Sequence, residues 1–181
     1  MDLLDEKNSL LIIIDIQEKL LNAAKDKDCA EKAAKLAKAA SILSIPVIIS
    51  EQYPKGLGNT VPEIYDNLPK NTFFQEKASF SLLKEEGFTD RLKSYGRKHI
   101  ILCGIETHIC VYQTATDLIN AGYEVTIVKD ACSSRNKYEC DCGIEKMKTA
   151  GAQISCLEIV LFEWLKGAKH PKFKEVQALI K

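Results

Sequence analysis

The chain has 181 residues, enough for one domain with a substantial core. Its 25 lysines and arginines balance 25 aspartates and glutamates, so charge gives no indication of binding to nucleic acid or to an anionic membrane. No apolar stretch reaches transmembrane length, and residues 1–6 are too polar for a signal peptide. Seven cysteines, an odd number, favour a reducing compartment over a disulfide framework. We therefore expect a cytoplasmic protein.

Apolar strands and amphipathic helices alternate along the chain. Continuous apolar runs predict strands at residues 10–14, 46–50 and 72–75, with a helix at 25–43. Residues 51–71 form a proline- and glycine-marked loop with a short helix near 61–68. Further strands are predicted at 100–103, 124–128 and 153–156, and helices at 88–95, from 107 onward, at 138–150, 159–166 and 173–180. The alternation predicts a three-layer αβα, Rossmann-like α/β fold with a six-stranded parallel sheet, in a single domain over residues 1–181.

The stretch from residue 100 to residue 116 carries the strongest functional signal. An apolar run ends at Gly104, and a helical period begins at Thr107, which we predict as the helix N-cap. Cys110 then falls in the first helical turn, where unpaired N–H groups and the helix dipole favour the nucleophilic thiolate. A buried core cysteine is the alternative interpretation of this position.

Asp15 and Lys77 also follow predicted strands. In a sheet of order 3-2-1-4-5-6, ligands bind at the carboxyl ends of the strands, at the switch point between strands one and four. Asp15 ends strand one, Lys77 ends strand three and Cys110 follows strand four. A carboxylate that accepts the thiol proton and an ammonium that stabilises both anions would converge there. Taken alone, Asp15 is more typical of a helix N-cap and Lys77 of a solvated surface charge.

The three groups are expected to titrate together. Lys77 and the helix dipole lower the pKa of the Cys110 thiol, whereas Asp15 disfavours a second anion. The proton of the resting protein would then lie between the carboxylate and the thiol. On balance we expect Cys110 to react with iodoacetamide at neutral pH faster than any other cysteine of the chain.

Four stretches resemble the isochorismatase-like cysteine hydrolases, a superfamily that includes nicotinamidases and N-carbamoylsarcosine amidohydrolases. The stretches are LLIIIDIQEKL, FFQEKASFS, CGIETHICVYQTATDLINAGYEVTIVKDACSSR and HPKFKEVQALI. A further loop, EQYPKGLG, is similar to the isochorismatase-domain-containing proteins. The resemblance covers nearly the whole chain and implies the isochorismatase-like hydrolase fold.

The resemblance also implies a mechanism. Asp15, Lys77 and Cys110 would form a catalytic triad, and the thiolate would attack an amide-type carbonyl to give a thioester that water hydrolyses. Backbone N–H groups of Glu106 and Cys110 would form the oxyanion hole, beside a non-proline cis peptide at Ile105–Glu106. The residues expected to contact the small-molecule substrate are Gln17, Tyr53 and Phe80.

Two departures from the family pattern narrow the chemistry. Nicotinamidases carry an Asp-x-His metal motif after the second strand, where this chain reads Ser50-Glu51-Gln52-Tyr53 and its loop holds no histidine. We therefore expect neither a metal nor another cofactor, and no nicotinamidase activity. Isochorismatases proper can dispense with the cysteine because vinyl-ether hydrolysis proceeds through protonation, so Cys110 favours acyl chemistry.

Two alternative functions stay open. One is vinyl-ether hydrolysis of the isochorismatase type, and the other is a catalytically idle homologue that serves as an oligomeric interaction protein. Whichever function holds, we expect a homo-oligomer, because the terminal helices carry more apolar residues than the surface of a monomer needs. These residues are Leu161, Phe162, Trp164 and Leu165.

Overall fold

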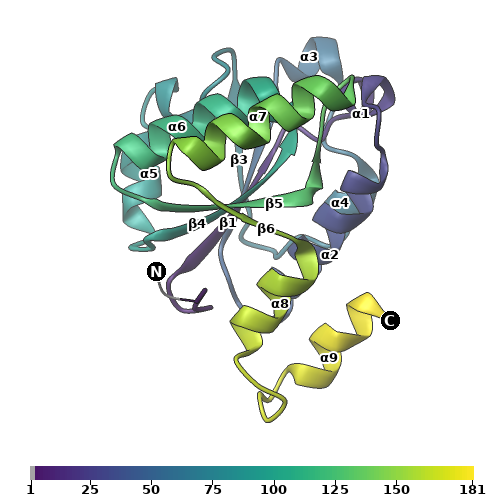
Figure 1. Ribbon diagram of the computed structural model, residues 1–181, viewed down its shortest axis with the longest axis vertical. Coiled ribbons are helices and arrows are strands. Elements are labelled where there is room, and N and C mark those ends of the chain that lie inside the picture. Colours follow the sequence, from purple (N-terminus) through teal and green to yellow (C-terminus); the bar gives the residue numbers. More distant parts are fainter. Residues whose placement is uncertain (1–2) are drawn as a thin grey trace.

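The computed structural model describes residues 3–181 and contains one six-stranded sheet in the order β3-β2-β1-β4-β5-β6 (Figure 1). All neighbouring strands are parallel, so the predicted sheet and its order are confirmed. The strands are β1 (Ser9–Ile14), β2 (Val47–Gln52), β3 (Phe73–Lys77), β4 (His99–Ile105), β5 (Glu124–Ser133) and β6 (Gln153–Ser155).

Helices connect the strands and cover both faces of the sheet. They are α1 (Glu18–Ala23), α2 (Asp28–Ile42), α3 (Pro54–Leu57), α4 (Pro62–Tyr65), α5 (Phe88–Ser94), α6 (Tyr112–Asn120), α7 (Lys137–Thr149), α8 (Leu157–Leu165) and α9 (Phe173–Gln177), with short helical turns η1 (Leu82–Lys84), η2 (Thr107–Val111) and η3 (Ala178–Ile180). Figure 1 shows α5, α6 and α7 on one face and α2 and α8 on the other, which confirms the three layers. Within residues 3–181, none of the helices is both long and apolar enough to cross a membrane.

The centre of the sheet is apolar on both faces. Every residue of β1 and of β4 is buried, as expected for strands that read as continuous apolar runs. Each fully buried Leu or Ile side chain contributes about 1.5–3 kcal/mol. By contrast, exposure alternates along β3, because this strand lies at the edge of the sheet. The two central strands therefore form a rigid support for the residues at their carboxyl ends.

Gly104 brings the ends of β1 and β4 unusually close together. It has a φ of 137°, and a Cβ atom on it would lie 2.1 Å from the carbonyl oxygen of Ile14. Only glycine fits at this distance and in this backbone conformation. The close approach occurs one residue before Asp15 and at the entry to the turn that carries Cys110.

Several elements differ from their predicted bounds. Strand β5 continues beyond residue 128 through Lys129 and Asp130, because β4 also continues and pairs Gly104 with Cys132 after a register shift. The sequence did not predict this longer strand, because Lys129 and Asp130 interrupt the apolar run. Helices α1 and α3 were not predicted, because both are short, bury no residue, and α3 contains a glycine.

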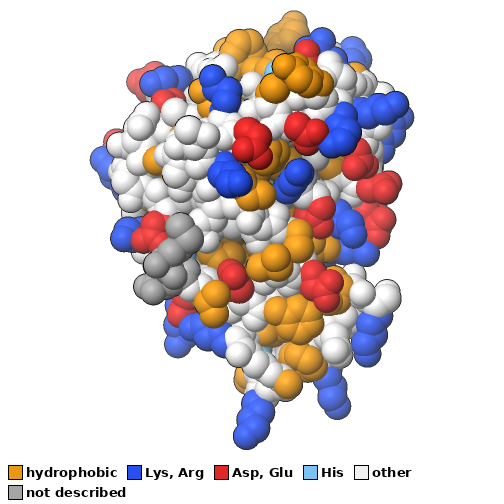
Figure 2. All heavy atoms as spheres, viewed as in Figure 1, with side chains coloured by type: hydrophobic (Ala, Val, Ile, Leu, Met, Phe, Trp, Pro, Cys, Tyr) orange, Lys and Arg blue, Asp and Glu red, His pale blue; other side chains and the backbone are white. Residues whose placement is uncertain are grey.

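The apolar residues of the C-terminal helices are mostly interior. Leu161, Trp164 and Leu165 are buried, so the expectation that they are exposed is wrong. The Trp164 indole N–H donates to Ser9 Oγ at 3.0 Å, which explains how the ring is held inside. Phe162 and Ile159 remain 39% and 50% exposed. Figure 2 shows apolar side chains at the surface over α8 and α9, interspersed with charged ones.

Candidate active site

Asp15, Lys77 and Cys110 meet at the carboxyl edge of the sheet. The Lys77 ammonium lies 2.7 Å from Asp15 Oδ2 and 3.4 Å from Cys110 Sγ. The side chains of Asp15 and Lys77 are fully buried, and Cys110 is 5% exposed. Residues that are distant along the chain therefore form one compact cluster of a carboxylate, an ammonium and a thiol.

Asp15 is held by β2 as well as by Lys77. It follows β1 directly and has a φ of 49°, in the left-handed region that aspartate tolerates better than most residues. Its backbone N–H donates to the carbonyl of Ser50 at 3.1 Å, and its Oδ1 accepts from Ser50 Oγ at 2.6 Å. Both carboxylate oxygens thus have a fixed partner, one neutral and one charged.

Lys77 occupies the last position of β3 and points inward. Beyond its contacts with Asp15 and Cys110, its ammonium donates to Gln52 Oε1 at 2.5 Å and lies 3.2 Å from the carbonyl oxygen of Ser79. A buried ammonium is costly unless its protons find acceptors, and here the Gln52 amide oxygen, the Ser79 carbonyl and the Cys110 sulfur supply them, while Asp15 Oδ2 balances the charge through the ion pair. The side chain is therefore fixed in a direction that faces the thiol.

The segment that presents Cys110 differs from the predicted helix start. Residues Thr107–Val111 form a π-helical turn that leads into α6, a geometry that often marks functional sites. Thr107 is not the N-cap, because Glu106 occupies that position and the Thr107 hydroxyl donates to the carbonyl of Ser133 at 2.9 Å. The Thr107 hydroxyl therefore bonds to β5 and does not cap the helix that follows it.

The pKa of the Cys110 thiol is raised to about 12, first by burial and then by the Asp15 carboxylate, while Lys77 opposes the shift. The expectation that the surroundings of Cys110 lower its pKa is therefore wrong, because burial could not be read from the position in the helix. It also removes the basis for expecting Cys110 to be the fastest cysteine to alkylate at neutral pH. A proton must leave the sulfur before it can act as a nucleophile.

Hydrogen bonds join the turn before Cys110 to the residues that follow β5. One carboxylate oxygen of Glu106 accepts from the backbone N–H of Arg135 at 3.2 Å and from its guanidinium at 2.9 Å. The peptide bond between Ile105 and Glu106 is cis, as expected. Within this turn, the backbone N–H groups of Ile109 and Val111 donate to the Glu106 carbonyl at 3.1 and 3.2 Å.

The expected substrate contacts fall into two groups. Gln17 is buried; its amide donates to the carbonyls of Gln52 and Gly58 at 3.1 and 2.6 Å and accepts from the Gln52 N–H at 2.7 Å. Its side chain therefore holds the loop after β2. Tyr53 and Phe80 are 63% and 52% exposed, and the Tyr53 N–H donates to the Lys77 carbonyl at 3.0 Å.

The loop after β2 shows no metal-binding arrangement. Glu51, in the stretch that stands where nicotinamidases carry their metal motif, accepts from the backbone N–H and the hydroxyl of Thr60 at 2.6 and 2.7 Å. Across residues 3–181, no group of three or more His, Cys, Asp or Glu side chains is arranged to hold a metal ion. Glu51 thus closes the loop through its bonds to Thr60.

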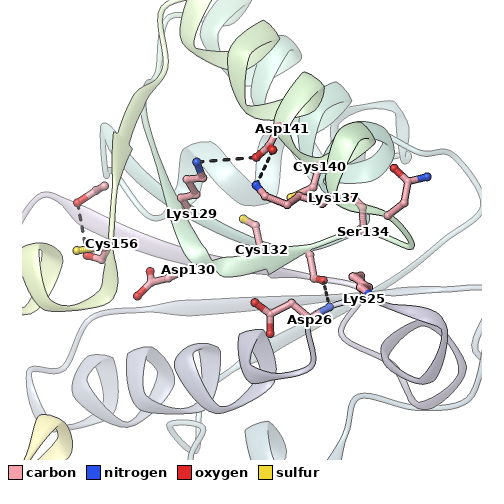
Figure 3. Close-up of a pocket in the computed structure, with 13 residues that line it drawn as sticks. Lys25, Asp26, Lys129, Asp130, Cys132, Ser134, Lys137, Cys140, Asp141 and Cys156 are labelled. Atoms are coloured by element: carbon pink, nitrogen blue, oxygen red, sulfur yellow. Dashed lines mark hydrogen bonds and ion pairs between the residues drawn. The ribbon is translucent and has the colours of Figure 1, made fainter.

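A separate cavity of about 410 Å³ lies at the carboxyl ends of β5 and β6 (Figure 3). Cys132 and Cys140 line it, but the lining residues found in the described chain do not include Asp15, Lys77 or Cys110. The Cys140 thiol donates to Thr107 Oγ1 at 3.3 Å. The cavity therefore borders the turn that carries Cys110 without containing the three clustered residues.

Three supporting residues were not predicted from the sequence. Ser50, Gln52 and Arg135 bond directly to Asp15, Lys77 and Glu106. The signal for the first two was their spacing, since Ser50 and Gln52 are two residues apart on a strand and so share one face. In the sequence they had been noted only as a departure from a metal motif.

An all-parallel αβα sheet with a buried carboxylate, ammonium and thiol at its switch point defines the class as an α/β protein of the isochorismatase-like hydrolase fold. The Isochorismatase domain model matches residues 9–159. The chain belongs to the isochorismatase family, and this membership supports hydrolase activity in general.

Individual relatives agree with this assignment. Isochorismatase domain-containing protein 2 of Xenopus laevis is 44% identical over 98% of this chain and 85% of its own length. A structure described as MAR1 ribonuclease from Caenorhabditis elegans has a TM-score of 0.93 and 40% identity, over 99% of this chain and 92% of that chain. The YcaC product of Escherichia coli, described as an octameric hydrolase of unknown specificity, shares the fold with a TM-score of 0.85 at 22% identity, over 99% and 95% of the two chains.

Proposed function

We propose that the protein is a cysteine-dependent hydrolase of a small amide or a related carbonyl compound. The observation that supports this most is the contact of the Lys77 ammonium with both Asp15 and Cys110, because it joins a nucleophile, a proton acceptor and a cation in one buried cluster. The proposed catalytic residues are Asp15, Lys77 and Cys110, with backbone N–H groups of Glu106 and Cys110 as the oxyanion hole.

The first half of the proposed reaction forms the thioester. Asp15 accepts the proton of the Cys110 thiol, and the sulfur attacks the substrate carbonyl carbon, so that an S–C bond forms and the carbonyl electrons move onto oxygen. The oxyanion-hole N–H groups stabilise that oxygen. When the tetrahedral intermediate collapses, the C–N bond breaks and the leaving nitrogen takes the proton from Asp15.

The second half returns the protein to its initial state. Water attacks the thioester carbon and gives one proton to Asp15 while an O–C bond forms. The S–C bond then breaks, the acid product leaves, and the proton returns to the Cys110 sulfur. The Lys77 ammonium stabilises whichever of the two partners is an anion at each stage. Because the resting thiol is protonated, turnover depends on transfer of its proton to Asp15.

Tyr53 and Phe80 are the proposed substrate contacts, because their exposed rings lie on segments that adjoin Lys77. We further propose a cytoplasmic, single-domain protein over residues 1–181 that acts without metal, nucleic acid or membrane and assembles into a homo-oligomer. The octameric description of the YcaC relative and the exposed Ile159 and Phe162 support assembly. Light scattering across a dilution series should give a mass above that of a monomer; a monomer throughout would contradict assembly.

Three other functions define the alternatives. Vinyl-ether hydrolysis would leave activity in a variant without the thiol, and an idle interaction protein would show no turnover at all. RNA cleavage is a further candidate, because the C. elegans relative at 40% identity is described as a ribonuclease. The absence of net charge on this chain gives that candidate no electrostatic support.

The test is a screen of small amides, carbamoyl compounds, isochorismate and RNA against the wild type and Cys110→Ser. Amide hydrolysis that Cys110→Ser abolishes, with a mass shift on the Cys110 peptide after rapid quenching, would support the thioester mechanism. Cleavage of isochorismate or RNA that survives in Cys110→Ser would overturn it. A Cys140→Ser variant controls for loss of a thiol elsewhere, since Cys140 lies outside the cluster.

A further inference from the structure

The end of β2 contacts both charged members of the cluster. Ser50 Oγ donates to Asp15 Oδ1 at 2.6 Å, and Gln52 Oε1 accepts from the Lys77 ammonium at 2.5 Å. Successive side chains of a strand point to opposite faces, so residues two apart share a face. Glu51, between them, points away and bonds to Thr60. One face of one strand therefore meets the carboxylate and the ammonium together.

The hydrogen bond from Ser50 strongly affects the charge of Asp15, because it reaches a buried carboxylate. Both side chains are buried, so water does not compete for the carboxylate oxygen. A bond to a charged group is stronger than one between neutral groups, and it stabilises the charged form. The other oxygen, Oδ2, faces Lys77. Ser50 therefore leaves Oδ2, on the side of Lys77 and the thiol, as the oxygen available for proton transfer.

We propose that Ser50 is a positioning residue of the active site, whose hydroxyl orients the Asp15 carboxylate and limits how readily it takes the proton of Cys110. The inference rests on the proposed hydrolase function, in which that proton transfer begins each turnover. Asp15 and Lys77 are the charged groups that act on the Cys110 thiol. Of these two groups, only the Asp15 carboxylate bonds to Ser50. Removing the Ser50 hydroxyl therefore acts on the thiol through Asp15.

The direction of the effect follows from the shared proton. Without the Ser50 hydroxyl the anionic carboxylate is less stabilised and becomes a better proton acceptor, so the proton moves from sulfur toward oxygen. Ser50→Ala should therefore increase the thiolate fraction of Cys110 about tenfold at a given pH, equivalent to about 1.4 kcal/mol. Ser50→Thr keeps a hydroxyl and should restore the wild-type value.

The experiment measures the rate at which iodoacetamide alkylates Cys110 at one fixed pH, followed by mass mapping, because this rate follows the thiolate fraction even when that fraction is far too small to absorb measurably. The matched control is Ser9→Ala, which removes an equally buried hydroxyl from the opposite end of β1, where it bonds to Trp164. The proposal expects a rise in Ser50→Ala and none in Ser9→Ala or Ser50→Thr, with circular dichroism unchanged. No rise in Ser50→Ala, or an equal rise in Ser9→Ala, would overturn it.

The readout needs no substrate, so the two proposals fail separately. A thiolate rise in Ser50→Ala without hydrolysis of any compound would support the role of Ser50 and contradict the hydrolase function. Hydrolysis by the wild type with an unchanged alkylation rate of Cys110 in Ser50→Ala would do the reverse.

Discussion

Replacing Lys77 with methionine tests whether the buried ion pair is as important to stability as its geometry indicates. Methionine keeps much of the volume but removes the ammonium, which leaves the Asp15 carboxylate buried with Ser50 as its remaining side-chain donor. Breaking a buried pair on one side costs about 3–5 kcal/mol, because the remaining charge is uncompensated. The bond from Ser50 persists, so we expect the lower end, about 3 kcal/mol, or a fall of about 6–12 °C in Tm for a chain of this size.

Denaturant unfolding of matched variants would measure this loss. Lys84→Met serves as the control, because Lys84 is 66% exposed and pairs with Asp117 at 3.4 Å on the surface. Such an exposed pair contributes under about 1 kcal/mol. The double variant Lys77→Met with Asp15→Asn should regain most of the stability, since asparagine tolerates the left-handed backbone and carries no charge. A loss no larger than that of Lys84→Met, or no recovery in the double variant, would refute the reasoning.

Three further outcomes are expected. Because the pKa of Cys110 is about 12, its alkylation by iodoacetamide, followed by mass mapping, should rise about tenfold per pH unit from about pH 7 to about pH 9; a rate that levels off near pH 8 would contradict the raised pKa. Gly104→Ala should lose more than about 4 kcal/mol in denaturant unfolding through contact with the Ile14 carbonyl. Gly122→Ala, also at positive φ but with open space, should lose about 1–2 kcal/mol, and equal losses would count against the close approach. Hydrolase activity should survive prolonged dialysis against a chelator, and its loss with restoration by zinc would show that a metal is required.

The sequence predicted those parts of the fold that depend on long apolar runs. Strands β1, β2 and β4 are such runs, and their alternation with helices indicated a parallel sheet. The common strand order of such sheets then placed Asp15, Lys77 and Cys110 at one edge. The parts that failed depend on contacts between distant segments. Thr107 bonds to β5 instead of capping a helix, and β5 continues through charged residues because β4 does.

Burial explains the remaining errors in the prediction. The pKa of Cys110 is dominated by removal from water, which no local pattern around residue 110 reveals. Trp164 looked exposed because its partner, Ser9, lies at the other end of the chain. In each case the decisive partner was remote in sequence.

Because Lys77 lies on the edge strand β3, we expect heating to disrupt the cluster of Asp15, Lys77 and Cys110 at a lower temperature than it unfolds the sheet. Strand β3 is outermost, hydrogen-bonded to β2 on one side and, in the described residues, to no strand on the other. Edge segments open locally at lower free energy than central ones, so Lys77 can detach while β1 and β4 stay paired. Heating should then abolish the reactivity that depends on Lys77 before the far-ultraviolet signal of the sheet changes, and cooling from that intermediate temperature should restore it. Over that range, we expect inactivation and unfolding to be two separate transitions.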